Sequence, residues 1–321
     1  MLSQSRRRFA AFAWGVLAFN ILVIIWGAYV RASFSGDGCG AHWPFCNGVV
    51  IPHAAATKTL VEFTHRVMTG LDTPLVIGLF IWAFVAFPRA HAVRRYSVLA
   101  FVFLVIEALL GAGLVLFRYV GSDASVGRAI YLSAHLTNTM MLLSALTITA
   151  WLGSTGEERI RFGDPPRLVK GLLPMALVIC ITGVIAALGD TLFPVSSLAT
   201  GMRQDFSSTS SMLLRLRMIH PAIAILGSVY LLWGAISVLQ KNSSSNSSRA
   251  AAIRVVTVTL GQALAGIVNL ALLAPVAMQL IHLFMADALW ICALLLLLET
   301  ARGTEAITVT PLMPVIHSGQ A

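Results

Sequence analysis

The sequence predicts an all-α integral membrane protein in which eight transmembrane helices form two tandem, pseudo-symmetric four-helix bundles. Composition is the first reason: 58% of the 321 residues are hydrophobic, only 11% are charged, and the mean hydropathy is +0.85. A soluble domain needs far more charge to cover its surface, so most of the chain is expected in a bilayer. The other two reasons are a series of long apolar runs and a repeat that relates the first half of the chain to the second.

Each apolar run is long enough to cross roughly 30 Å of hydrocarbon, which takes about 20 helical residues. The runs lie at about residues 10–32, 60–86, 97–118, 128–152, 171–191, 212–238, 254–275 and 278–299. The first run is too long for a cleaved signal sequence and has no small-residue cleavage site, so it is expected to be the first membrane helix. The tract KNSSSNSS at 241–248 is expected to be a flexible polar linker.

Basic residues indicate which loops face the cytoplasm. Arg6–Arg8 precede the first run, and further Arg or Lys residues occur in every second loop after it. By the positive-inside rule, those loops and both termini are cytoplasmic, whereas the loops at 33–59, 119–127 and 192–211 face outside. We therefore expect a multi-pass protein of a bacterial cell membrane, in contact with lipid. The net charge of +9 does not indicate nucleic acid, because the basic residues form short clusters between apolar runs instead of one stripe.

An internal repeat relates the two halves of the chain. Shifting the sequence by 155 residues places Glu107 on Gln262 and His65 on His220. An even number of helices separates equivalent positions, so the two bundles are expected to be parallel repeats. The first bundle is expected to span residues 1–155 and the second residues 156–321.

Four histidines lie inside the predicted helices: His65, His135, His220 and His282. A further slip of eight residues, explained by a shorter final outer loop, places His135 on His282, so each half carries an equivalent pair. All four lie roughly 6–12 Å below the outer ends of their helices, at about 1.5 Å per residue. Two histidines on facing helices of a bundle can ligate heme iron on both faces. A single buried histidine would more often be a hydrogen-bonded core residue, and zinc, the rival metal, would call for carboxylate or thiolate ligands as well.

Arginines near the same depth are candidates for binding the heme propionates. Arg217 lies one turn before His220, on the same helical face and nearer the outside. Arg128, Arg203 and Arg215 are further candidates. The alternative for each of them is an arginine that extends to the membrane interface.

Together these features resemble the heme A synthase family. The loop GCGAHWPFC at 38–46 and the helix start Glu62-Phe63-Thr64-His65-Arg66 carry the resemblance, with His135 and the pair His220 and His282 in later helices. The combination of the cysteine loop with the E-x-x-H-R start is specific, and the resemblance covers essentially the whole chain.

The resemblance implies different tasks for the two halves. It implies that heme O, the substrate, binds between His65 and His135 with Arg66 beside it, and that the cofactor, a permanent heme b, is held between His220 and His282. It implies an oxidoreductase that oxidises one ring methyl of heme O to a formyl group in two successive steps, through a hydroxymethyl stage, to give heme A for terminal oxidases. Candidate partners are a heme O-producing farnesyltransferase and an electron partner that the sequence does not identify.

Glu62 is the candidate catalytic residue. It precedes His65 by three residues, so both should face the same side, whereas the equivalent position in the second half is Arg217. A carboxylate beside one heme only suits a reacting site, where it could accept a proton or stabilise positive charge developing on the methyl carbon. The alternative is an ion pair with Arg66 along the helix.

Cys39 and Cys46 lie in the first outer loop. Because the compartment is oxidising and turn-forming residues surround both cysteines, we expect a disulfide that fastens a lid over the first-half site, with Trp43 as an apolar plug. A redox role for the pair is the alternative, which the resemblance suggests for some family members. The matching loop at 192–206 has no cysteine, which argues against a relay of two disulfides.

Three acidic residues inside the helices, Asp72, Glu107 and Asp287, are expected to make buried polar contacts between helices, with a proton path as the alternative. Two other functions stay open. A non-catalytic diheme cytochrome b would need both histidine pairs but not Glu62, and a heme carrier would bind heme reversibly without changing its side groups.

Overall fold

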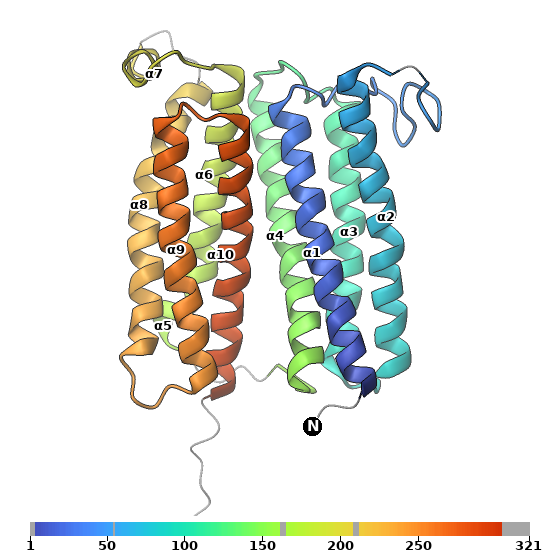
Figure 1. Cartoon of the computed structure of the whole chain (residues 1–321), viewed down its shortest axis with the longest axis vertical. Coiled ribbons are helices and arrows are strands. Elements are labelled where there is room, and N and C mark those ends of the chain that lie inside the picture. The colour runs from blue at the N-terminus through green and yellow to red at the C-terminus, as the bar shows by residue number, and fades with distance from the viewer. Residues whose placement is uncertain (1–3, 54, 161–164, 208–211, 304–321) are drawn as a thin grey trace, which may run out of the picture.

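The structure is a computed structural model that describes residues 4–53, 55–160, 165–207 and 212–303, and these residues form helices and loops without a sheet. Figure 1 shows two bundles side by side, one of α1 to α4 and the other of α6 and α8 to α10, with the short α5 and α7 at opposite ends of the second bundle. The long helices are α1 (Gln4–Ala32), α2 (Thr57–Ala86), α3 (Ala92–Leu116), α4 (Val126–Thr155), α6 (Leu172–Leu192), α8 (Met212–Leu239), α9 (Asn246–Ala271) and α10 (Val276–Gly303). The short helices are α5 (Arg167–Lys170) and α7 (Leu198–Asp205).

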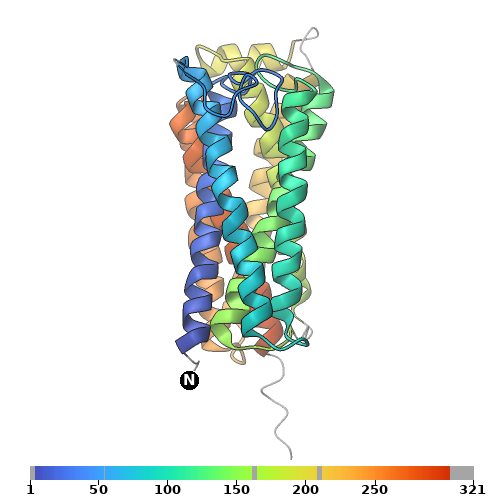
Figure 2. The ribbon, with the colours of Figure 1, turned by 90° about the vertical axis from the view of Figure 1, so that its right-hand side faces the viewer.

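All eight long helices are long and apolar enough to cross a membrane. The predicted fold class, an all-α multi-pass membrane protein with eight spans, is therefore confirmed. Because the long helices alternate in direction, the first begins and the last ends at the same end of the molecule, which we call the inner end (Figure 1). Figure 2 shows the loop after α1 and the segment containing α7 together at the opposite, outer end.

Two helices begin at serine N-caps that the apolar pattern did not predict. Ser245 accepts a hydrogen bond from the backbone N–H of Ser248, so α9 already begins at Asn246. The prediction of a flexible linker over 241–248 is therefore wrong for residues 246–248. In the same way, Ser197 caps α7, which lies within the predicted outer loop at 192–211. Residues 208–211 of that loop lie outside the described residues.

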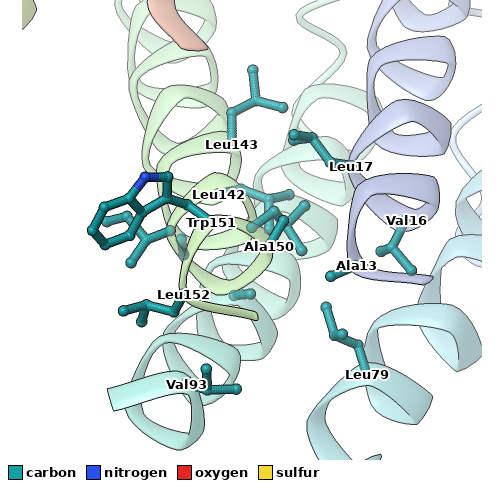
Figure 3. Close-up of a cluster of buried hydrophobic side chains, with 14 of the residues drawn as sticks. Ala13, Val16, Leu17, Leu79, Val93, Leu142, Leu143, Ala150, Trp151 and Leu152 are labelled. Atoms are coloured by element: carbon teal, nitrogen blue, oxygen red, sulfur yellow. The ribbon is translucent and has the colours of Figure 1, made fainter. Parts of the chain in front are cut away.

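An apolar core closes the inner part of the first bundle. Figure 3 shows side chains from all four of its helices in this core, among them Leu17, Leu79, Val93 and Leu143. On α4, every residue from 138 to 153 is buried except Met141 and Ser144, whereas no residue from 130 to 137 is buried. α4 is thus largely buried toward its inner end and only partly buried around His135, nearer the outer end.

Two tryptophans connect the bundles through hydrogen bonds. Trp151 of α4 donates its indole N–H to Glu299 of α10 at 2.7 Å, and Trp290 of α10 donates to the hydroxyl of Ser144 on α4 at 2.9 Å. Trp290 also belongs to the apolar core of the first bundle. A buried indole N–H needs such an acceptor, so these bonds fix how α4 and α10 pack.

Candidate functional site

Each of the four intramembrane histidines belongs to a different helix. His65 lies on α2, His135 on α4, His220 on α8 and His282 on α10, each within the outer third of its helix. All four histidines are partly exposed, although most of α4 further inward is buried. The histidines therefore lie at one level of the molecule, two in each bundle.

The rings of His220 and His282 face each other in the second bundle. Their centroids are 6.5 Å apart and their planes are nearly perpendicular, at 81°. A metal bound to one nitrogen of each ring at about 2.0–2.1 Å would hold the two ring centroids roughly 6 Å apart. The observed spacing would allow the two rings to hold one metal between them.

A threonine fixes the orientation of His220. Oγ1 of Thr182, on α6, lies 3.0 Å from Nδ1 of His220. The Thr182 hydroxyl itself donates to backbone carbonyl oxygens of its own helix, so it accepts the proton of Nδ1. Nε2 of His220 then carries the lone pair that a metal ligand needs. Thr182 was not predicted from the sequence, because the pattern of residues along one helix does not show which residue of another helix will contact that helix.

Every one of the four imidazoles packs against a glycine of a neighbouring helix. The pairs are Gly27 with His65, Gly111 with His135, Gly183 with His220 and Gly266 with His282. A Cβ atom would lie 3.0 to 3.1 Å from the ring at Gly27, Gly183 and Gly266, closer than ordinary contact, and 3.8 Å from it at Gly111. Glycine therefore lets three of the rings lie directly against helix backbone. The repeat carried this signal, because Gly111 and Gly266 differ by the same 155 residues as Glu107 and Gln262.

The outer cysteine loop is closed by the predicted disulfide. Cys39 and Cys46 are bonded, with an S–S distance of 1.99 Å, and both are buried. Trp43, which follows a turn of the same loop, is 44% exposed. Trp43 is thus more than half buried at the outer end, and its role as an apolar plug stays a prediction.

Glu62 and Arg66 tie this loop to α2. Glu62 is 4% exposed, and its carboxylate accepts the backbone N–H of Cys39 at 2.8 Å. Its other oxygen pairs with Arg66 at 2.5 Å, so the ion pair considered from the sequence is present. Arg66 in turn donates to the backbone carbonyl oxygens of His42 and Phe45 at 2.7 and 2.8 Å. The carboxylate one turn from His65 is thus held by the disulfide loop and by its own helix.

Arg217 and Arg128, two of the four candidate propionate-binding arginines, have partners within the protein. Arg217 is 8% exposed and pairs with Asp205 of α7 at 2.5 Å and with Asp190 of α6 at 3.3 Å. Arg128 is buried and donates to two backbone carbonyl oxygens of the loop before α4. Arg217 therefore joins α7 to the second bundle, and Arg128 shapes an outer loop. Arg203 and Arg215 are exposed.

Two of the three intramembrane acids make the expected contacts between helices. Asp72 accepts from Asn20 of α1 at 2.8 Å, and Glu107 accepts from Asn138 of α4 at 2.6 Å. Asp287 is fully buried, and neither of its oxygens has a hydrogen-bond partner among the residues described. The prediction of a polar contact is wrong for Asp287 within that part of the chain.

Heme fits this donor set better than a metal ion held by protein alone. A heme brings four ring nitrogens of its own and needs only two axial ligands, which each bundle offers as a histidine pair. Zinc would need three or four protein ligands. No group of three or more His, Cys, Asp or Glu residues suited to a metal ion occurs in the described ranges. Buried ring nitrogens without a protein partner there, at His65 and His282, also suit a ligand that is not part of the chain.

Comparisons with known proteins found one family model and several relatives similar to this chain. A family model described as cytochrome oxidase assembly protein, COX15-CtaA, matches residues 10–294. A Thermus thermophilus protein named protoheme IX farnesyltransferase is 41% identical over 323 residues, which cover 99% of this chain and 53% of that protein. A heme A synthase of an Exiguobacterium species is 35% identical over 186 residues, covering 58% of this chain and 60% of the relative. One from Halalkalibacterium halodurans is 38% identical over 126 residues, covering 39% and 42%. The chain thus spans about half the length of the curated relatives that match nearly all of it.

Proposed function

The chain belongs to the COX15-CtaA family of cytochrome oxidase assembly proteins, and on that premise we propose that it is a heme A synthase. Its reaction is the oxidation of one ring methyl of heme O to a formyl group, in two successive steps through a hydroxymethyl stage. The observation that carries the proposal is the pair of intramembrane histidines at the outer end of each bundle. Relatives named heme A synthase, at 35% and 38% identity, support it.

Heme O is the proposed substrate of the first bundle, residues 1–155. Its iron would be held between His65 and His135, with Arg66 beside it. The partly exposed α4 residues around His135 support this placement, because an interior that the chain leaves incompletely filled can accept a large ring. When bound, heme supplies an iron centre capable of one-electron chemistry. The chain supplies the axial imidazoles, their orientation and an apolar surrounding that limits water.

Heme b is the proposed cofactor of the second bundle, residues 156–321. His220 and His282 would be its axial ligands, supported by their ring spacing of 6.5 Å and by the bond from Thr182 to His220. Arg217 is the proposed contact at the propionate edge, shared with its two aspartate partners. This heme would pass electrons between the first bundle and a partner outside the chain, across helices that pack directly on one another.

Glu62 is the proposed proton acceptor in the oxidation of the methyl group. Its burial and its position one turn from His65 support the role. The bond from Cys39 also makes Glu62 an anchor for the disulfide loop. Closure of that loop and placement of the carboxylate are therefore coupled.

Glu62→Gln separates catalysis from anchoring. Glutamine keeps the size and can still accept the N–H of Cys39, but it removes the charge and the proton acceptor. The rate should fall by about a hundredfold or more, with heme O or the hydroxymethyl intermediate accumulating in membranes. Second-half heme content and the intact Cys39–Cys46 disulfide serve as folding controls. Near-normal heme A output would leave Glu62 only its anchoring role.

The Thermus proteins named protoheme IX farnesyltransferase extend well beyond the part that this chain matches. These relatives thus join a segment similar to this chain to nearly as much further sequence in one polypeptide. That arrangement supports a heme O-producing farnesyltransferase as a partner that delivers the substrate.

A bacterial cell membrane with cytoplasmic termini is the proposed location. Arg6–Arg8, Arg89 and Arg94 lie toward the inner end, as the positive-inside rule requires of the cytoplasmic side. The disulfide lies at the outer end, where an oxidising compartment would maintain it. Heme A would then be made near the outer face.

A non-catalytic diheme cytochrome b is the second candidate, favoured by the two similar histidine pairs, and a heme carrier is the third. The porphyrins extracted from cells with and without the protein distinguish them. Heme A that appears only with the protein supports the synthase. Unchanged porphyrins, with two bound hemes b, would support the cytochrome, and reversibly bound, unaltered heme would support the carrier.

A further inference from the structure

Glu107 holds His135 through a network of hydrogen bonds between α3 and α4. Oε1 of Glu107 lies 2.9 Å from Nδ1 of His135. The same carboxylate accepts from the hydroxyl of Thr139 at 2.5 Å and from the amide of Asn138 at 2.6 Å. Because donors from α4 converge on its two oxygens, Glu107 is the acceptor and Nδ1 of His135 carries the proton. Nε2 of His135 is then available as a metal ligand.

Gln262 occupies the equivalent place in the second bundle. It aligns with Glu107 in the repeat, and its amide nitrogen lies 3.3 Å from Nε2 of His282, whereas Glu107 contacts Nδ1 of His135. The two side chains have nearly the same shape, but one is an anion and the other is neutral. Equivalent histidines in the two halves therefore have partners that differ by a full negative charge.

That charge matters for an iron bound to the histidine. A carboxylate that accepts the proton of an imidazole raises the basicity of the opposite ring nitrogen and strengthens its bond to the metal. A negative charge in an apolar interior also favours the more positive oxidation state of a nearby metal. The neutral amide of Gln262 carries no charge that would create this preference.

We propose that Glu107 is a positioning residue that strengthens the axial bond of His135, and that the difference between Glu107 and Gln262 makes the first-half heme the stronger reductant of the two. The inference rests on the proposed function, because it takes a heme at each histidine pair as its premise. With a heme held by each histidine pair, this difference would favour transfer of one electron from the first-half iron to the second-half iron. The first iron would be oxidised and the second reduced, without a proton or a co-reactant.

Exchanging the two residues, with Glu107→Gln in one variant and Gln262→Glu in another, tests whether the first-half heme is the stronger reductant. Purified full-length protein, with its own heme and with hemin added as the probe for the first bundle, is titrated potentiometrically while the reduced-minus-oxidised spectrum is followed. Glu107→Gln should move only the lower-potential wave upward, and Gln262→Glu only the higher-potential wave downward. Changes to such supporting residues alter metal affinity by about 10–100-fold. A tenfold change in the preference for one oxidation state corresponds to about 59 mV for a one-electron couple.

Thr139→Val is the matched control, since it removes one donor to Glu107 and leaves the carboxylate in place. It should move the wave much less than Glu107→Gln, and an equal shift would overturn the role of the charge. Two waves that neither exchange moves would overturn the inference and leave the proposed function standing. A single wave in the wild-type protein saturated with hemin would instead contradict the proposed heme site of the first bundle. If Gln262→Glu does not retain heme, the inference is tested by Glu107→Gln alone. An upward shift of the lower-potential wave supports it, and an unmoved wave overturns it.

Discussion

The glycine that faces His220 allows a direct test of how the histidines are positioned. In Gly183→Ala, the new methyl group would lie 3.1 Å from Cε1 of His220 and 3.6 Å from both ring nitrogens. Ordinary contacts begin at 3.4 Å, so the ring or its helix must move by a few tenths of an ångström. The ring cannot simply turn away, because Thr182 holds its Nδ1.

The expected loss of heme affinity follows from the narrow range of ligand distances that metal sites tolerate. Ligand distances in such sites are held to within about 0.2 Å, so the displacement is large enough to weaken the bond to iron. We expect heme affinity to fall by about tenfold or more, as for other residues that support a metal ligand, which is about 1.4 kcal/mol per factor of ten. The helix itself should become more stable, because alanine is favoured over glycine in helices by about 0.8–1.0 kcal/mol.

The assay therefore follows heme and fold separately. The heme-to-protein ratio and the low-spin b-type spectrum of Gly183→Ala report binding, and the melting temperature of heme-free protein reports the fold. Gly266→Ala, with its methyl 3.0 Å from the ring of His282, should behave in the same way. Gly111→Ala is the matched control, because its methyl would be 3.8 Å from the nearest ring atom of His135. Wild-type heme content and spectrum in Gly183→Ala would refute the reasoning.

Three further predictions concern the ligands, the loop and the inner end. His220→Ala should abolish the low-spin spectrum of the second-half heme, because one axial ligand cannot hold iron in the same state; an unchanged spectrum in folded protein would contradict the assignment. Mass spectrometry of an alkylated, unreduced digest should find Cys39 linked to Cys46, and alkylation of both would remove the loop staple. Burial and the nearby Arg6 lower the pKa of His91, the residue that caps α3. Because folded protein then binds this proton less readily than the unfolded chain, stability should decline as the pH falls through the unfolded-state value of 6.5, with a slope of at most about 1.4 kcal/mol per pH unit. His91→Asn keeps a capping side chain and should flatten that part of the thermal-unfolding profile, and an equally steep decline would count against the assignment.

The membrane spans could be predicted because lipid demands long, continuous apolar segments, and this demand is written along the chain. Helix ends were less predictable, since they depend on single capping bonds. Ser245 starts α9 inside a tract that looks like a linker, and Ser197 starts α7 inside a loop. The spacing of apolar residues along the chain does not indicate either capping hydrogen bond.

The histidine pairs could be predicted as equivalent positions because the internal repeat appears in the sequence as a shift of 155 residues. Contacts between distant segments could not be predicted in this way. Arg217 was expected to be available to a ligand, but it pairs with aspartates of α6 and α7, and only the folded arrangement brings these three together. Glu62 was recognised from its spacing to His65, whereas its bond to Cys39 depends on how the outer loop folds back onto α2.

The matched positions of Glu107 and Gln262 also bear on how two bundles related by the repeat can differ. Codons for glutamate and glutamine differ only in their first base, so a single nucleotide substitution is enough to exchange one side chain for the other. The replacement conserves volume, so it requires little repacking of neighbouring helices. The two halves can therefore diverge at this position without an intermediate that has a disrupted core.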